Sequence, residues 1–146
     1  MRICIISTDY PEEGRPVFTF VKNIVDALAD IGNECFVIAP YSITKNKRLH
    51  KNYESYTTEK GSVVEVCRPN YLSLSNINIM GCNISGWMHK QAVNRALKKL
   101  KKTPDVIYCH FWVSGLECYT FSKKHNIPLF VASGESEIPQ SVMSNK

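Results

Sequence analysis

The segment Asp105-Val-Ile-Tyr-Cys-His110-Phe-Trp-Val-Ser-Gly115 combines a strand, a polar aromatic turn and the start of a helix. Its first residues are apolar enough for a strand that is buried on both faces, as in a parallel sheet. In an open α/β sheet, ligands bind beyond the carboxyl ends of the strands. The segment therefore predicts an α/β fold, and it places His110, Trp112 and Ser114 at a strand end where a ligand could bind.

The same order of strand, turn and helix opens the chain. Arg2–Ser7 is a continuous apolar run, and apolar residues at helical spacing follow from Pro16 to Ile31. Gly32 supplies a stop for that helix. The remaining strands are predicted at Cys35–Ala39, Val63–Cys67, Val106–Cys109 and Leu129–Ala132, and the remaining helices at Trp87–Leu100 and Ser114–His125.

Alternating strands and helices predict a Rossmann-like, doubly wound sheet that is mainly parallel. We expect the strand order 3-2-1-4-5, which makes the first strand central and puts Val106–Cys109 beside it. Two polar stretches, Tyr41–Gly61 and Arg68–Ser85, are predicted as a surface excursion and a loop. Such folds usually continue with a sixth strand. We therefore expect residues 1–146 to form a single domain of a longer protein.

Three loops should meet at the switch point of this sheet, namely Asp9–Pro16, His110–Gly115 and Ser133–Glu137. A helix N-terminus beside a glycine attracts anions, and an arginine adds a planar fork of donors. A histidine can exchange a proton near neutral pH. The candidate catalytic residues are His110 and Glu135, and the candidate substrate-binding residues are Asp9, Gly14, Arg15, Trp112, Ser114, Ser133, Gly134, Ser136 and Glu137.

Each candidate also has a structural interpretation. The Gly14 loop could be a plain turn that puts Pro16 at the first helical position. Either Ser133 or Ser136 could cap a helix, and the carboxylates beside them suit sugar hydroxyls equally well. A histidine at a strand end is often structural, and Trp112 could stack on a sugar or simply pack.

The composition excludes several classes of protein. Hydrophobic residues make up 44% and charged residues 21%, as in ordinary globular proteins. No apolar run approaches the roughly 20 residues of a membrane-spanning helix, and Ile3–Ile6 is too short for a signal peptide, so we expect a cytoplasmic protein. The six cysteines lack CxxC spacing and are expected to be buried thiols, with no metal site. No dinucleotide or phosphate-loop fingerprint occurs.

The net charge of +5 comes partly from two basic clusters, Lys45–Lys51 and Lys98–Lys102. The second cluster ends a predicted helix, where cations complement the helix dipole and solvate the surface. Contact with anionic lipid headgroups is the alternative, and it would place the protein peripherally at the inner face of the membrane. No stacking motif or basic recognition helix accompanies the charge, so we expect no nucleic-acid partner.

Taken together, these segments resemble the N-terminal domain of family 4 (group 1) glycosyltransferases of the two-domain GT-B type. The first half matches at Arg2–Ile6, Tyr10-Pro11, Gly14, Val21, Leu28 and Ile31–Val37. Asp105–His110 is similar to the family's DVIHxH, His110–Gly115 to its HYWLSG and Ile127–Val131 to its xPxVxT. The chain departs from the family in having Arg15-Pro16 after Gly14 instead of a second glycine, and Gly134-Glu135 near the place of a usual histidine.

The resemblance implies that this domain binds the acceptor and that a C-terminal domain, absent from the sequence, binds most of the nucleotide-sugar donor. It implies transfer of a sugar to a glycan or lipid-linked acceptor, as in cell-surface polysaccharide biosynthesis. It also implies retention of the anomeric configuration and no metal or other cofactor. Two alternatives remain: a non-catalytic Rossmann-like module that binds a nucleotide or carbohydrate, and an interaction domain without a small ligand.

Overall fold

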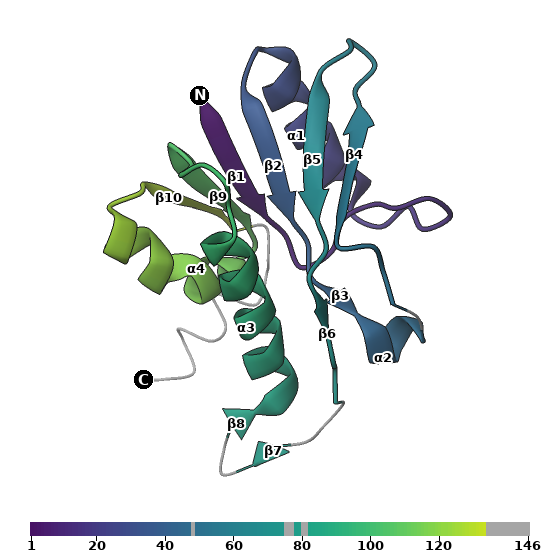
Figure 1. The fold of residues 1–146 in the computed structure, drawn as a ribbon, viewed down its shortest axis with the longest axis vertical. Coiled ribbons are helices and arrows are strands. Elements are labelled where there is room, and N and C mark those ends of the chain that lie inside the picture. Colours follow the sequence, from purple (N-terminus) through teal and green to yellow (C-terminus); the bar gives the residue numbers. More distant parts are fainter. Residues whose placement is uncertain (48, 75–77, 80–81, 134–146) are drawn as a thin grey trace.

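The computed structural model describes residues 1–47, 49–74, 78–79 and 82–133. Its centre is a six-stranded sheet in the order β10-β9-β1-β2-β5-β4 (Figure 1). The strands are β1 (Arg2–Ile6), β2 (Glu34–Ile38), β4 (Tyr53–Thr57), β5 (Val63–Cys67), β9 (Val106–His110) and β10 (Leu129–Ala132). Every neighbouring pair is parallel except β4 with β5. The parallel strands follow the predicted order 3-2-1-4-5, which confirms a mainly parallel α/β sheet compatible with a Rossmann-like fold.

Three helices cover the two faces of the sheet. Helix α1 (Thr19–Asp30) lies on one face, and α3 (Ile84–Lys98) and α4 (Trp112–His125) lie on the other (Figure 1). The small elements are β3 (Tyr41–Ser42), α2 (Ile43–Asn46), β6 (Asn70–Tyr71), β7 (Asn78–Ile79) and β8 (Cys82–Asn83). Of these, β3 and β6 pair in parallel beyond the carboxyl ends of β2 and β5. They extend the region where the sequence predicted a site.

The core has two halves because side chains alternate along β1. Ile3 and Ile5 pack toward α1, while Cys4 and Ile6 pack toward α3 and α4. Burying an aliphatic side chain of this size stabilises a fold by about 1.5–3 kcal/mol. The predicted buried thiols are confirmed at Cys4, Cys35, Cys67 and Cys109.

Helix α1 begins three residues later than the apolar spacing predicted. Glu12 and Arg15 exchange backbone hydrogen bonds of 3.2 and 3.0 Å across a tight turn, so the chain reverses before it can become helical. Phe18 then precedes the helix in the left-handed conformation, with φ 51°. Ile31, predicted as part of the apolar face, follows the helix and is exposed.

The stretch Tyr41–Gly61 was expected to be a surface excursion, and this was wrong in part. It contains the edge strand β4, whose Tyr-Glu-Ser-Tyr-Thr sequence alternates and pairs antiparallel with β5. The hydroxyl of Tyr56 donates a 2.7 Å hydrogen bond to Asp26 of α1, which ties this strand to the core. Likewise, the loop predicted at Arg68–Ser85 includes β6 and the first residues of α3.

Candidate functional site

A cavity of about 400 Å³ lies at the carboxyl ends of β1 and β2. We call it the carboxyl-end cavity. Its walls come from the loop after β1, from β3 and α2, from β6, and from helices α3 and α4. Segments far apart in the sequence therefore meet where parallel sheets bind their ligands. Its size is within the range of about 300–1,000 Å³ that is usual for small-molecule sites.

The wall from the loop after β1 carries a chain of ion pairs. The guanidinium of Arg15 lies 3.0 Å from a carboxylate oxygen of Asp9 and 3.6 Å from one of Glu12. Glu12 in turn lies 3.0 Å from Nε2 of His50. These ion pairs fix the loop, and both Asp9 and Arg15 line the cavity.

The wall from β3, α2 and β6 adds hydroxyls and a cation. Burial raises the pKa of Tyr71, the carboxylate of Asp9 raises it further, a hydrogen bond from Ser42 lowers it, and Glu117 adds a smaller rise. Asp9 and Glu117 therefore act on the same phenol from different sides of the cavity. Lys45 also lines the cavity, and within the described part of the chain its ammonium makes no ion pair.

The wall from α3 and α4 holds a buried acid–base pair. Nδ1 of His89 lies 2.6 Å from Oε1 of Glu117, and the two side chains are only 11% and 7% exposed. The other carboxylate oxygen, Oε2, is sealed from solvent and has no hydrogen-bond partner among the described residues. The edge of the His89 ring contacts the Tyr71 ring, with centroids 5.1 Å apart. We call His89 and Glu117 the buried dyad.

The buried dyad was not predicted from the sequence. Its only local signal is that two polar residues occupy inward positions of helices, next to apolar neighbours such as Val93 and Cys118. The pairing itself depends on how α3 packs against α4, and no motif in the sequence reports that packing.

His110, the strongest candidate from the sequence, lies outside the lining of the carboxyl-end cavity. It ends β9 on the side facing α1, with its ring centroid 5.0 Å from that of Phe20 and 4.5 Å from that of Phe111. Its Nδ1 lies 3.2 Å from the Tyr108 hydroxyl. Burial lowers the pKa of this imidazole. Its surroundings are those of a packed aromatic cluster.

The other sequence candidates are divided between the cavity and its surroundings. Asp9 and Arg15 line the cavity together. Gly14 is exposed at the tip of the Glu12–Arg15 turn, with φ +76° and open space around it, so the turn itself accounts for this glycine. The other described candidates are placed as follows: Trp112 is half-exposed at the start of α4, Ser114 is fully buried and its hydroxyl has no partner among the described residues, and Ser133 is exposed after β10. Gly134, Glu135, Ser136 and Glu137 lie outside the described residues.

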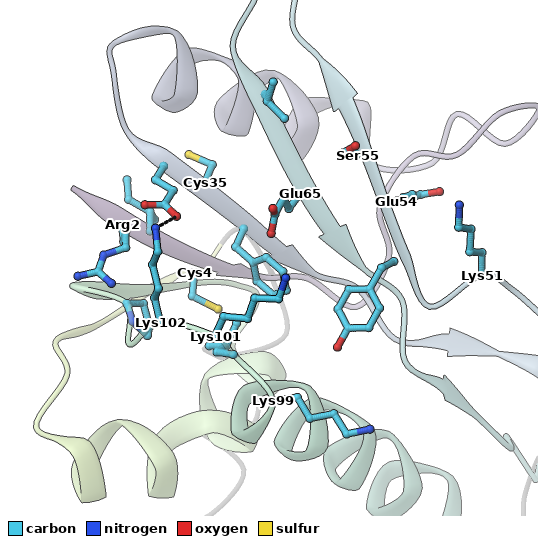
Figure 2. A pocket seen from close by; sticks show the side chains of 17 residues that line it. Arg2, Cys4, Cys35, Lys51, Glu54, Ser55, Glu65, Lys99, Lys101 and Lys102 are labelled. Atoms are coloured by element: carbon cyan, nitrogen blue, oxygen red, sulfur yellow. Dashed lines mark hydrogen bonds and ion pairs between the residues drawn. The ribbon is translucent and has the colours of Figure 1, made fainter.

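A larger hollow, of about 840 Å³, lies apart from the carboxyl-end cavity and reaches the amino ends of β1 and β2 (Figure 2). It runs over the face of β2, β5 and β4 opposite α1, and its rim includes Lys99, Lys101 and Lys102 after α3. Lys102 pairs with Glu34 at 3.3 Å. Its floor is a sheet face that no long helix covers in the described part of the chain. It lacks the converging buried polar groups of the smaller cavity, so the smaller cavity is the better candidate site.

Comparisons with known proteins assign no family. No protein-family profile matches the sequence, and no curated protein sequence matches it. Among the described residues, no three His, Cys, Asp or Glu side chains are grouped so as to hold a metal ion. No helix in the described ranges is long and apolar enough to cross a membrane. A function must therefore be inferred from the chemistry of the carboxyl-end cavity.

Proposed function

We propose that the chain is the acceptor-binding domain of a glycosyltransferase, corresponding to the N-terminal half of a GT-B enzyme. A second domain would carry most of the nucleotide-sugar site. The acceptor, a glycan or a lipid-linked sugar, occupies the carboxyl-end cavity. Transfer proceeds with retention, as the sequence resemblance implies, and needs no metal.

The observation that carries this proposal is the cavity itself. It lies at the strand ends of a parallel sheet, and its walls combine carboxylates, hydroxyls, two phenols and two cations. Sugar hydroxyls both donate and accept hydrogen bonds, so they match such a mixed lining. Asp9 and the hydroxyls of Ser42 and Tyr71 supply acceptors, while Arg15 and Lys45 supply donors.

The basic residues after α3 fit an acceptor that is anchored in a membrane. Lys98 ends the helix, and three further lysines follow it at the rim of the larger hollow. Each lysine near an anionic bilayer contributes about 1 kcal/mol to binding. We propose that this cluster holds the protein at the inner face of the membrane, without nucleic-acid partners.

Saturation-transfer nuclear magnetic resonance tests the acceptor site on the 146-residue chain. We expect some members of a panel of methyl glycosides to bind, which is detected as saturation transferred from the protein to the ligand. Asp9→Asn removes a charged acceptor, so binding should weaken by about tenfold. Glu65→Gln, on the exposed face of β5, is the matched control and should change nothing.

Two results would count against this assignment. If no glycoside binds, or if Asp9→Asn and Glu65→Gln behave alike, the carboxyl-end cavity is not a sugar site. A non-catalytic carbohydrate-binding module would bind glycosides in the same cavity. An activity assay on the full-length protein separates such a module from a transferase. Transfer of a radiolabelled sugar to the bound glycoside occurs only if the protein is a transferase.

A further inference from the structure

We propose that His89 is a proton acceptor for a ligand hydroxyl in the carboxyl-end cavity and that Glu117 holds it in the required tautomer. The identity of the proton donor, a hydroxyl of the acceptor sugar, rests on the proposed function. The reactive state of His89 rests on the buried dyad alone.

The tautomer follows from the contact between the two side chains. An ionised carboxylate can only accept hydrogen bonds, so Nδ1 of His89 must carry the hydrogen that bridges to Oε1 of Glu117 at 2.6 Å. In the neutral imidazole, Nε2 then carries the lone pair. A carboxylate in this position also stabilises the imidazolium that forms when Nε2 takes up a proton.

The lone pair of His89 faces a space that a ligand can enter. Nε2 makes no hydrogen bond within the described part of the chain, and it is not among the unpaired atoms that are sealed from solvent. His89 lines the carboxyl-end cavity. The Tyr71 ring, in edge contact at 5.1 Å, restricts rotation of the imidazole. Glu117 therefore fixes Nδ1 of the imidazole, Tyr71 restricts its rotation, and Nε2 is left open toward the cavity.

The buried dyad is not needed to hold α3 against α4. Asn94 of α3 already donates a 3.2 Å hydrogen bond to the backbone carbonyl of Glu117, and it does so without an ionisable group. A buried ion pair is often no more stabilising than apolar residues of the same volume. Moreover, Oε2 of Glu117 is buried and has no hydrogen-bond partner among the residues that the structure describes. The dyad thus carries a cost in stability that a catalytic role would explain.

The proposed step is balanced in atoms and electrons. The O–H bond of the acceptor hydroxyl breaks, and its proton goes to Nε2 of His89. The oxygen forms a bond to the anomeric carbon of a nucleotide sugar on the face from which the diphosphate leaves, so the configuration is retained. The bond from that carbon to the diphosphate oxygen breaks, and the electron pair leaves with the nucleoside diphosphate. The other charged or titratable groups that line the cavity around this step are Asp9, Arg15, Tyr41, Lys45 and Tyr71.

Two measurements on the 146-residue chain test the state of His89 directly. Long-range proton–nitrogen-15 spectra at about pH 8 should show His89 with hydrogen on Nδ1, whereas free neutral imidazole favours hydrogen on Nε2. Diethyl pyrocarbonate should acylate His89 at Nε2, as read by peptide mass spectrometry. Glu117→Gln should slow that acylation by about tenfold or more. Glu65→Gln is the matched control and should leave the rate unchanged.

The proposal is overturned if neutral His89 carries its hydrogen on Nε2, or if the reagent does not reach it in folded protein. The tautomer of His89 and its access to the reagent are both measured on the wild-type chain, so these tests remain valid even if Glu117→Gln does not fold. They are also independent of sugar binding. A reactive His89 without glycoside binding would overturn the proposed function alone, and glycoside binding with an Nε2–H tautomer would overturn only the proton acceptor.

Discussion

His110 illustrates how a residue can lie at the right end of a strand and still face away from a cavity. The pleat of β9 turns Ile107 and Cys109 toward α3 and α4, and it turns Tyr108 and His110 toward the side of α1. The sequence correctly places His110 at the carboxyl edge of the sheet. The direction of its side chain depends on a register that only the folded sheet defines.

The burial of His110 leads to a prediction about pH. Its pKa is lowered from the ordinary value of 6.5 because burial disfavours the charged imidazole. The unfolded chain therefore binds this proton more readily, and stability falls as the pH drops below 6.5 toward the lower folded pKa. His110→Phe keeps a ring against Phe20 and removes the titration. We expect the wild type to lose more stability than this variant over that pH range.

Urea denaturation at several pH values from about 7 down to about 5.5 measures this loss. Equal slopes for the wild type and His110→Phe would show that the burial of His110 has no effect on its proton affinity.

At the level of elements, the predictions succeeded where one face or both faces of a segment are buried. The apolar runs of β1 and β9 gave the right strands and the right neighbours. Strand β4 was missed because, as an edge strand, it is polar on its exposed positions and half-buried on the others. The start of α1 was misplaced because the Glu12–Arg15 turn leaves no trace in apolar spacing.

Helix α4 packs closely against β10 at Gly115, which has no side chain. A Cβ atom built on Gly115 would lie 2.7 Å from Cγ2 of Val131, closer than packed carbons approach. We expect Gly115→Ala to destabilise the fold by about 1–3 kcal/mol, because the helix must move away from the strand. Adding Val131→Ala removes the obstructing methyl groups and should restore part of the loss.

Thermal and urea unfolding of the single and double variants measure this effect. Gly86→Ala is the control, because its added Cβ meets nothing closer than 3.7 Å and lies in the first turn of α3. That variant should be neutral or slightly stabilising. A Gly115→Ala protein as stable as the wild type would mean that α4 can shift against β10 without cost.

Over the whole molecule, the sequence predicts the position of the candidate cavity better than the residues that line it. The strand order predicts a cavity at the carboxyl edge of the sheet, and the loop after β1 predicts Asp9 and Arg15 among its lining residues. The buried dyad does not follow in this way. His89 and Glu117 come from two helices, 28 residues apart, and they meet only because both helices pack on the same sheet face.

The proposed function divides donor binding and acceptor binding between two domains. Transfer requires the donor and acceptor to be held together, and that positioning supplies much of the rate. The sequence has no glycine-rich phosphate fingerprint, and Arg15 of the carboxyl-end cavity is already paired with Asp9 and Glu12. The 146-residue chain should therefore neither bind nucleotide sugars tightly nor turn them over.

Calorimetry with uridine and guanosine diphosphate sugars measures this affinity. We expect dissociation constants of about 1 mM or weaker, at which the binding free energy is only about −4 kcal/mol. A methyl glycoside that binds in the resonance experiment serves as the control that the chain is folded and its cavity open. Micromolar binding of a nucleotide sugar would instead place the donor in this domain. The cations Arg15 and Lys45 would then be its phosphate ligands, and the buried dyad would face the donor rather than the acceptor.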